Sequence, residues 1–226
     1  WATTLDYPII TYTDGSNIEN VCQKKVTGKQ RLLNVKLDTL STNEEIISED
    51  IISKLEDLLS EGGCAGIIVN TVKRAQKIAH ALSQHFGGDQ VQLLHSRFLA
   101  VDRAQKEKEL FAKLGVDGDR PQRCIVVGTQ VFEQSCDLDF DVLISDICPM
   151  DLLIQRIGRL HRHPRHRLFK LRQPHCFLIG LSDSGFDRGA ELIYGKYLLM
   201  NTQELLPLQI KIPDDIPQLV QETYRP

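Results

Sequence analysis

The segment from Gln155 to Arg167 concentrates positive charge. It reads QRIGRLHRHPRHR, with arginines at positions 156, 159, 162, 165 and 167 and histidines at 161, 163 and 166. No acidic residue occurs between Asp151 and Asp183. Arginine keeps its charge at physiological pH, and its planar fork of N–H donors matches the oxygens of a phosphate group. The segment therefore indicates an anion site, with a solvated basic helix end as the alternative.

Two of these arginines are expected to act together. Arg159 and Arg162 stand three positions apart on a short helix predicted over 151–160, which we expect Pro164 to terminate. At about 100° per residue, both side chains would lie on nearly the same face while the helix continues. Two like charges so close repel each other, and a bound anion would offset that repulsion.

Apolar strands alternate with amphipathic helices from position 44 onward. The predicted strands cover 65–71, 91–96, 123–129, 141–146 and 175–181. The predicted helices cover 44–59, 72–86, 102–115 and 151–160. This alternation predicts an α/β fold in which helices cover both faces of an open, mostly parallel sheet.

The domain organisation follows from this pattern. Residues 44–182 are predicted to form the α/β domain. Residues 1–43 carry two predicted strands around a polar connector and are assigned to a preceding domain. Residues 183–226 hold three of the nine prolines near their end and are predicted to form a terminal helix and a linker towards a further domain. A chain that starts at Trp1 is expected to be a piece of a longer protein.

Polar side chains follow the carboxyl ends of four predicted strands. These segments are NT at 70–71, HSR at 95–97, GTQ at 128–130 and SD at 145–146. Ligands of open α/β sheets bind outside the carboxyl ends of the strands. We therefore expect these segments and the arginine run to converge on one rim of the sheet.

Four segments, in order, resemble motifs of the CRISPR-associated helicase–nucleases of type I systems, which are superfamily 2 helicases. GIIVNTVKRAQ is similar to motif IV, LLHSRFLAVDR to the segment after it, VVGTQVFEQSCDLDFDVLISD to motif V, and QRIGRLHRH to motif VI. The resemblance covers roughly 64–164. It implies that residues 44–182 form a second RecA-like domain, with a mostly parallel sheet between two helical layers.

The resemblance implies an ATP site that includes the arginine run. Arg159 and Arg162 match arginine fingers that reach the γ-phosphate, and Gln155 and Arg156 match the start of the same motif. Asp137 matches the motif V carboxylate that faces the ribose. A packing role for Arg156 and a loop-capping role for Asp137 remain alternatives.

The resemblance also implies a track for single-stranded DNA along the rim. The predicted contacts are Thr71, Arg74, His95, Ser96, Arg97, Thr129 and Gln130. Hydroxyl, amide and cationic donors suit phosphate oxygens, and the helix that starts after Thr71 offers backbone N–H groups. A structural role for 95–97 is nearly as well supported. Glu133 and Gln134 could couple the nucleotide to the strand.

Several chemical elements of a motor are not found in the sequence. It has no Gly-x-x-x-x-Gly-Lys-Ser/Thr loop, no DEAx box and no His-Asp dipeptide, and the TGKQ at 27–30 lacks the frame of a phosphate loop. In the resembled family these elements lie on the first RecA-like domain and the nuclease domain. We therefore expect the Mg²⁺ of ATP and the nuclease metal to be held outside this chain, which alone should be inactive. No metal is assigned to the histidines near position 163, because neighbouring arginines repel a cation.

Composition limits the remaining possibilities. The chain is 42% hydrophobic with a net charge of −3, which is ordinary for a globular domain and excludes a wholly basic nucleic-acid coat. No apolar run approaches about 20 residues, so no membrane span is predicted. Six cysteines without a Cys-x-x-Cys pair indicate free thiols and a reduced, cytoplasmic setting.

The resemblance thus implies the second motor domain of an ATP-dependent single-stranded DNA translocase or helicase that degrades foreign DNA with a nuclease domain. By resemblance, its partners are single-stranded DNA, the first RecA-like and nuclease domains, and a guide-RNA surveillance complex. A superfamily 2 repair or branch-migration helicase is one alternative. The other is a non-catalytic nucleic-acid-binding module with a RecA-like fold.

Overall fold

The computed structural model describes residues 9–22, 32–40, 49–133, 137–182 and 185–225. Gln134 and residues 44–48 of the first predicted helix lie outside these ranges. The described ranges include the whole arginine run and all four strand ends that the sequence identifies as polar.

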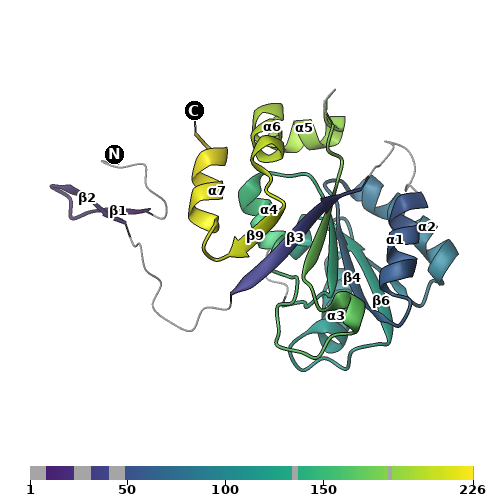
Figure 1. The fold of residues 1–226 in the computed structure, drawn as a ribbon. Helices are drawn as coiled ribbons and strands as arrows, with labels where there is room; N and C mark the ends of the chain where they lie inside the picture. The colour runs from purple at the N-terminus through teal and green to yellow at the C-terminus, as the bar shows by residue number, and fades with distance from the viewer. Residues whose placement is uncertain (1–8, 23–31, 41–48, 134–136, 183–184, 226) are drawn as a thin grey trace.

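A seven-stranded sheet forms the centre of the molecule (Figure 1). The strand order is β5-β6-β4-β7-β8-β3-β9. Its strands are β3 (Leu33–Thr39), β4 (Gly63–Ile68), β5 (Val91–Leu94), β6 (Arg123–Gly128), β7 (Val142–Asp146), β8 (His175–Ile179) and β9 (Gln209–Ile212). All neighbouring pairs are parallel except β3 and β9, which are antiparallel. The predicted mostly parallel sheet is confirmed.

Helices cover both faces of this sheet. One face carries α1 (Glu49–Leu58) and α2 (Val72–Phe86), and the other carries α3 (Ala100–Leu114), α4 (Met150–Ile157) and α7 (Ile216–Thr223). Two further helices, α5 (Arg188–Tyr194) and α6 (Lys196–Leu205), pack on the loops that follow β7 and β8. Within the described residues, no helix has the length and apolar character that crossing a membrane requires.

Alternation along the strands explains the three layers. In β4, Ala65 and Ile67 are fully buried among α1 and α2, while Cys64 and Ile68 are fully buried against the helices of the opposite face. A parallel strand with both faces covered needs apolar residues at every position rather than at every second one. The continuous apolar runs in the sequence reflect this requirement.

The predicted domain boundaries need correction, because β3 and β9 belong to the central sheet. Lys36 to Thr39 of β3 pair with His175 to Leu178 of β8, and Leu33 to Lys36 pair with Gln209 to Ile212 of β9. Strand β3 lies in the predicted preceding domain (1–43), and β9 lies in the predicted linker (183–226). Among the strands of the described ranges, only β1 (Ile9–Thr13) and β2 (Ile18–Cys22) form a separate antiparallel sheet, which Figure 1 shows apart from the main body.

The helix predicted over 151–160 is also shorter than expected. It ends at Ile157 rather than near Pro164, and the N–H of Gly158 donates to the carbonyl of Ile154 at 2.9 Å. Leu160, almost fully buried, then forms a parallel β-bridge with Phe140, and His161 takes a left-handed backbone with φ 48°. Pairing with the segment before β7 replaces the last helical turn.

Candidate functional site

Strand order places the predicted polar segments side by side. Strands β5, β6, β4 and β7 are consecutive neighbours, so their carboxyl ends meet at one rim, as predicted. The backbone N–H of Asn70, after β4, donates to Asp146 at the end of β7 (2.9 Å). The side-chain amide of Gln130, after β6, donates to the backbone carbonyl of Asn70 (2.8 Å). Hydrogen bonds thus tie three strand ends together.

A glycine lets β6 turn sharply at this rim. A Cβ on Gly128 would lie 2.1 Å from the Phe132 ring and 2.5 Å from the carbonyl oxygen of Leu94. Any side chain would therefore collide with the 3-10 turn at Gln130–Phe132 and with β5. Thr129, next to this glycine, is 1% exposed. Its side chain faces the interior, which corrects its prediction as a contact to DNA.

Thr71 and Arg74 begin α2 at the rim. The Thr71 hydroxyl accepts a hydrogen bond from the backbone N–H of Arg74 (3.3 Å), which caps the helix. The Arg74 guanidinium lies 3.0 Å from Asp146. Burial raises the pKa of Asp146, although Arg74 favours its charged form. Arg74 remains partly exposed and can meet a second anion beside Asp146.

The next strand end separates one buried side chain from two exposed ones. His95 is 3% exposed and stacks on Phe98, with ring centroids 4.2 Å apart. Burial lowers the pKa of His95, which favours its neutral form. Ser96 and Arg97 lie in the following turn and are exposed. This placement favours the structural alternative for His95 and leaves Ser96 and Arg97 accessible to a ligand.

Arg156 lies in the protein interior, with no exposed surface. Its guanidinium pairs with Glu133 at 2.7 Å and donates to the Ser145 hydroxyl (3.0 Å) and to the side-chain oxygen of Asn70 (3.1 Å). Burial raises the pKa of Glu133 above its ordinary value despite the pairing. Arg156 was predicted to contact a nucleotide. Its position corrects that expectation and favours the packing role, because three strand-end segments enclose the guanidinium.

Arg159 points towards the backbone of the motif V segment. It is 9% exposed, and its guanidinium donates to the carbonyl oxygens of Phe132 (2.9 Å) and Glu133 (3.0 Å). Because the helix ends at Ile157, Arg159 and Arg162 do not share a helical face. The first of the two predicted fingers is therefore held inward in this conformation.

Arg162 and Asp137 meet at the surface. The guanidinium of Arg162 pairs with the Asp137 carboxylate, and both side chains remain well exposed, at 39% and 45%. Hydrogen bonding to Arg162 lowers the pKa of Asp137, and the ring of His163 lies 3.3 Å from the same carboxylate. Gln155 is also exposed, on α4. The structure thus brings two predicted nucleotide contacts together where another molecule can reach them.

The rest of the arginine run does not reach the rim as expected and pairs instead with acidic residues just before β7, which sequence reasoning left out of the site. Arg165 contacts Asp139 at 2.7 Å, and Arg167 contacts both Asp139 (2.7 Å) and Asp141. The segment DLDFD at 137–141 thus supplies three alternating carboxylates to the arginines in chain order. The alternating carboxylates at 137–141 and the arginines of the run are both visible in the sequence, so their pairing could have been predicted from it. This pairing explains why so many arginines can lie close together, because the carboxylates offset their mutual repulsion.

Comparison with known proteins places this geometry in a family. Residues 61–165 match the family described as CRISPR-associated nuclease/helicase Cas3, C-terminal. The chain is 47% identical over 219 residues to a CRISPR-associated nuclease/helicase Cas3 of Streptococcus thermophilus, covering 96% of this chain and 23% of that protein. The chain belongs to the Cas3 family.

Solved Cas3 structures share the fold. The structure titled T. fusca Cas3-ATP has a TM-score of 0.78 and 33% identity, covering 88% of this chain and 24% of that one. A chain titled CRISPR RNA-guided surveillance complex, pre-nicking, has a TM-score of 0.75 and 32% identity, covering 86% and 25%. The predicted RecA-like α/β fold is confirmed. The chain spans about a quarter of the length of these Cas3 relatives.

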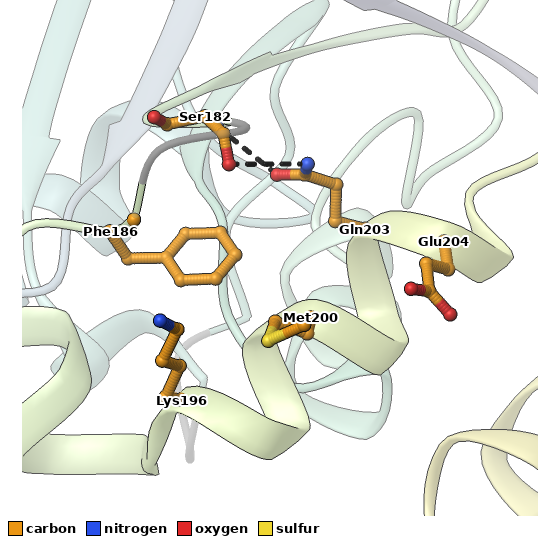
Figure 2. A pocket seen from close by; sticks show the side chains of 7 residues that line it. Ser182, Phe186, Lys196, Met200, Gln203 and Glu204 are labelled. Atoms are coloured by element: carbon orange, nitrogen blue, oxygen red, sulfur yellow. Dashed lines mark hydrogen bonds between the residues drawn. The ribbon is translucent and has the colours of Figure 1, made fainter.

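A hollow of about 290 Å³ lies outside the segment that matches the Cas3 family (Figure 2). Figure 2 shows the Phe186 ring between Ser182 and Lys196, beside Met200 of α6. The side chain of Gln203, on α6, forms hydrogen bonds with the backbone N–H and carbonyl of Ser182 at 3.1 and 3.4 Å, which joins two sides of the hollow. No residue predicted for the site lines this hollow, so it is separate from the rim.

Proposed function

We propose that this chain is the second RecA-like motor domain of an ATP-dependent single-stranded DNA translocase or helicase. With a nuclease domain elsewhere in the protein, it would degrade foreign DNA in CRISPR interference. The relatives named nuclease/helicase support this assignment. The observation that carries it is the exposed Asp137–Arg162 pair, which lies within residues 61–165 that match the Cas3 family, because an accessible arginine can complete an anion site.

We propose that the anion is ATP, bound between this domain and the first RecA-like domain. ATP hydrolysis supplies the free energy of movement. Arg162 would exchange Asp137 for phosphate oxygens, and Asp137 would then accept hydrogen bonds from the ribose. Arg159 would leave the carbonyls of Phe132 and Glu133 to reach the phosphate as the other finger. Structures titled with ATP and AMPPNP among the Cas3 relatives support nucleotide binding.

Magnesium is assigned to the domain that is absent from this chain. Within the described residues, no group of three or more His, Cys, Asp or Glu side chains is arranged to hold a metal ion. The carboxylates nearest Arg162 are paired with arginines, which disfavours a divalent cation at the same place. The residues described here fit the anionic part of ATP rather than its metal.

Single-stranded DNA would bind along the rim through its phosphates. The exposed Ser96 and Arg97, the partly exposed Arg74 and the N-terminus of α2 offer donors in the order of the strands. Contacts to phosphates position a strand without reading its bases. Delivery by a guide-RNA surveillance complex is supported by the solved complex that contains a similar chain. Buried free thiols at Cys64, Cys124, Cys148 and Cys176 suit a reducing cytoplasm.

The decisive experiment measures DNA-stimulated ATP hydrolysis by the full-length protein. Arg162→Ala should lower the stimulated rate about a thousandfold or more, the range known for arginine fingers. Arg172→Ala is the matched control, because Arg172 is an exposed arginine just before β8, away from the rim. Equal rates for the two variants would contradict the assignment. If the wild type bound DNA in a salt-dependent way without hydrolysing ATP, a non-catalytic binding module would be favoured instead.

The isolated 226-residue chain is a second test. It should neither hydrolyse ATP nor cut DNA, because the phosphate loop and the metal ligands are assigned to other domains. Purified chain would be assayed with single-stranded DNA, ATP and Mg²⁺ beside its Arg162→Ala variant. Hydrolysis by the chain that this substitution abolishes would show that the phosphate site is complete here.

A further inference from the structure

Tyr194 contacts both halves of the proposed site from outside the matched family segment. It is the last residue of α5, beyond residues 61–165, the range that matches the family described as Cas3, C-terminal. Its hydroxyl oxygen accepts hydrogen bonds from the guanidinium of Arg156 (3.2 Å) and from the side-chain amide of Gln130 (3.0 Å). One oxygen of α5 therefore joins motif V to motif VI.

Both partners of Tyr194 also contact Asn70 at the end of β4. Gln130 donates to the Asn70 backbone carbonyl at 2.8 Å, and Arg156 donates to its side-chain oxygen at 3.1 Å. Arg156 additionally pairs with Glu133. Three strand-end segments that are distant in sequence therefore share one hydrogen-bond network, and the Tyr194 hydroxyl completes it.

The hydroxyl is suited to hold this network without changing its charge. Burial raises the pKa of Tyr194 to about 12, so the phenol stays neutral at any pH at which the protein works. A neutral oxygen accepts from an arginine and an amide without repelling Glu133. A phenylalanine would keep the ring packing and remove only this acceptor, leaving buried donors short of a partner.

We propose that Tyr194 is a positioning residue that couples the DNA-contacting turn at Gln130 to the motif VI arginines. This inference rests on the proposed function. Gln130, partly exposed, follows the buried Thr129 in the turn after β6, and the enclosed Arg156 precedes the predicted finger Arg159 by three residues. The hydroxyl of Tyr194 sets the distance between these two side chains. A displacement of α5 would consequently be transmitted to both.

The test uses the full-length protein with Tyr194→Phe and the matched control Tyr197→Phe. Tyr197 lies on α6, and its hydroxyl donates to the backbone carbonyl of Arg225 at 2.6 Å, away from the rim. We expect Tyr194→Phe to raise the single-stranded DNA concentration for half-maximal ATPase stimulation about fivefold, the size expected for one lost hydrogen bond. The KM for ATP should change less than about twofold, and Tyr197→Phe should change neither quantity.

The outcomes separate coupling from a merely structural role. If Tyr194→Phe lowered the thermal midpoint and all rates by one common factor, with the half-stimulating DNA concentration unchanged, the hydroxyl would only support the fold and the inference would fail. An equal shift in both tyrosine variants would overturn it as well. A wild-type protein without DNA-stimulated ATPase would instead overturn the proposed function. An active wild type with an unaffected Tyr194→Phe would overturn this inference alone.

Discussion

Two groups of arginines and buried carboxylates stand at opposite ends of the sheet, one with a single arginine and the other with three. At the carboxyl end, Arg156 meets one carboxylate, Glu133, and several neutral groups. At the amino end, three arginines surround two carboxylates; the group is Arg120, Arg165, Arg167, Asp139 and Asp141. The first cluster lies beneath the proposed ligand rim. The second joins the segment before β7 to the end of the arginine run.

The two clusters differ in which physical effect controls the carboxylates. Burial raises the pKa of Asp141, but Arg120 and Arg167 outweigh it, so that the pKa lies below its ordinary value. Burial also raises the pKa of Glu133, and there Arg156 does not outweigh it, so that the pKa stays above its ordinary value. The amino-end carboxylate is thus stabilised in its charged form by the fold. At the carboxyl end, burial makes the charged form of Glu133 less favourable than it is in water.

The difference between the two pKa shifts suggests different roles for the two clusters, one in stability and the other in function. Removing one partner of a well-compensated buried pair leaves unpaired charge and strongly destabilises a protein. Arg156, with one carboxylate and several neutral partners, can exchange hydrogen bonds when neighbouring segments move. We infer that the amino-end cluster holds motifs V and VI together, while the carboxyl-end cluster sets the arrangement of the ligand rim.

The largest effect on stability is expected at the amino end. Asp139→Asn should lower the free energy of unfolding by about 3–5 kcal/mol, because Asp139 is fully buried among three arginines. Urea unfolding followed by circular dichroism measures this change. Asp117→Asn, at an exposed aspartate, is the control. A loss below about 1 kcal/mol for Asp139→Asn, the range of exposed ion pairs, would show that the amino-end cluster does not stabilise the fold.

A smaller loss is expected at the carboxyl end. Glu133→Gln should lower the free energy of unfolding by about 1–3 kcal/mol, because the amide still accepts from Arg156 and burial already disfavours the carboxylate. The same unfolding experiment applies, with the exposed Glu61→Gln as control. If Glu133→Gln cost more than Asp139→Asn, the contrast between the two ends would be reversed.

Stability should also depend on pH through His161, beside the amino-end cluster. Burial, with repulsion from Arg167, lowers the pKa of His161 to about 4. In the unfolded chain the His161 imidazole therefore binds a proton near pH 6.5, whereas in the folded chain it stays neutral until about pH 4. Stability should fall by on the order of 2 kcal/mol as the pH drops from about 6.5 to about 4.

His161→Asn isolates this contribution, since asparagine tolerates the left-handed backbone at this position. Unfolding free energies measured between pH 4 and pH 7 should depend less steeply on pH in this variant. His80→Asn, at an exposed histidine, should keep the wild-type slope. Parallel profiles for wild type and His161→Asn would refute the assignment to this side chain.

The smallest stability effect is expected between the two clusters. Arg162→Ala should change the free energy of unfolding by less than about 1 kcal/mol, because its pair with Asp137 is well exposed. The same substitution should lower DNA-stimulated ATPase about a thousandfold. Thermal unfolding of the variant used in the ATPase assay measures both effects on one sample. A collapse of stability in Arg162→Ala would assign this arginine to the amino-end cluster.

Local patterns predicted the interior elements well. The helix expected over 72–86 coincides with α2, and the strand expected over 91–96 is β5 at Val91–Leu94. Strand β9, at Gln209–Ile212, was not predicted because a short edge strand depends on a partner far along the chain. The helix end near Ile157 depends on the bridge between Leu160 and Phe140, which local periodicity does not reveal.

The convergence of the polar strand ends was predicted, and the environments of the individual side chains only in part. The sequence placed polar strand ends on one rim, and sheet order brings them together. It did not show that Arg156 is enclosed, nor that Tyr194 reaches it from α5. Chain position specifies which residues are available. Burial and hydrogen-bond geometry specify which of these residues can give up their internal partners and bind a ligand.

By itself, the sequence determined the α/β alternation, the motif order and the presence of excess positive charge, because these depend on residue type and short spacing. Only the tertiary structure decided where each charge goes. Arg162 remains accessible, whereas Arg156 and Arg167 are buried with carboxylates more than 20 residues away in the chain. The physical reason is that desolvation makes an unpaired buried charge too costly, so partner choice is settled when the segments pack.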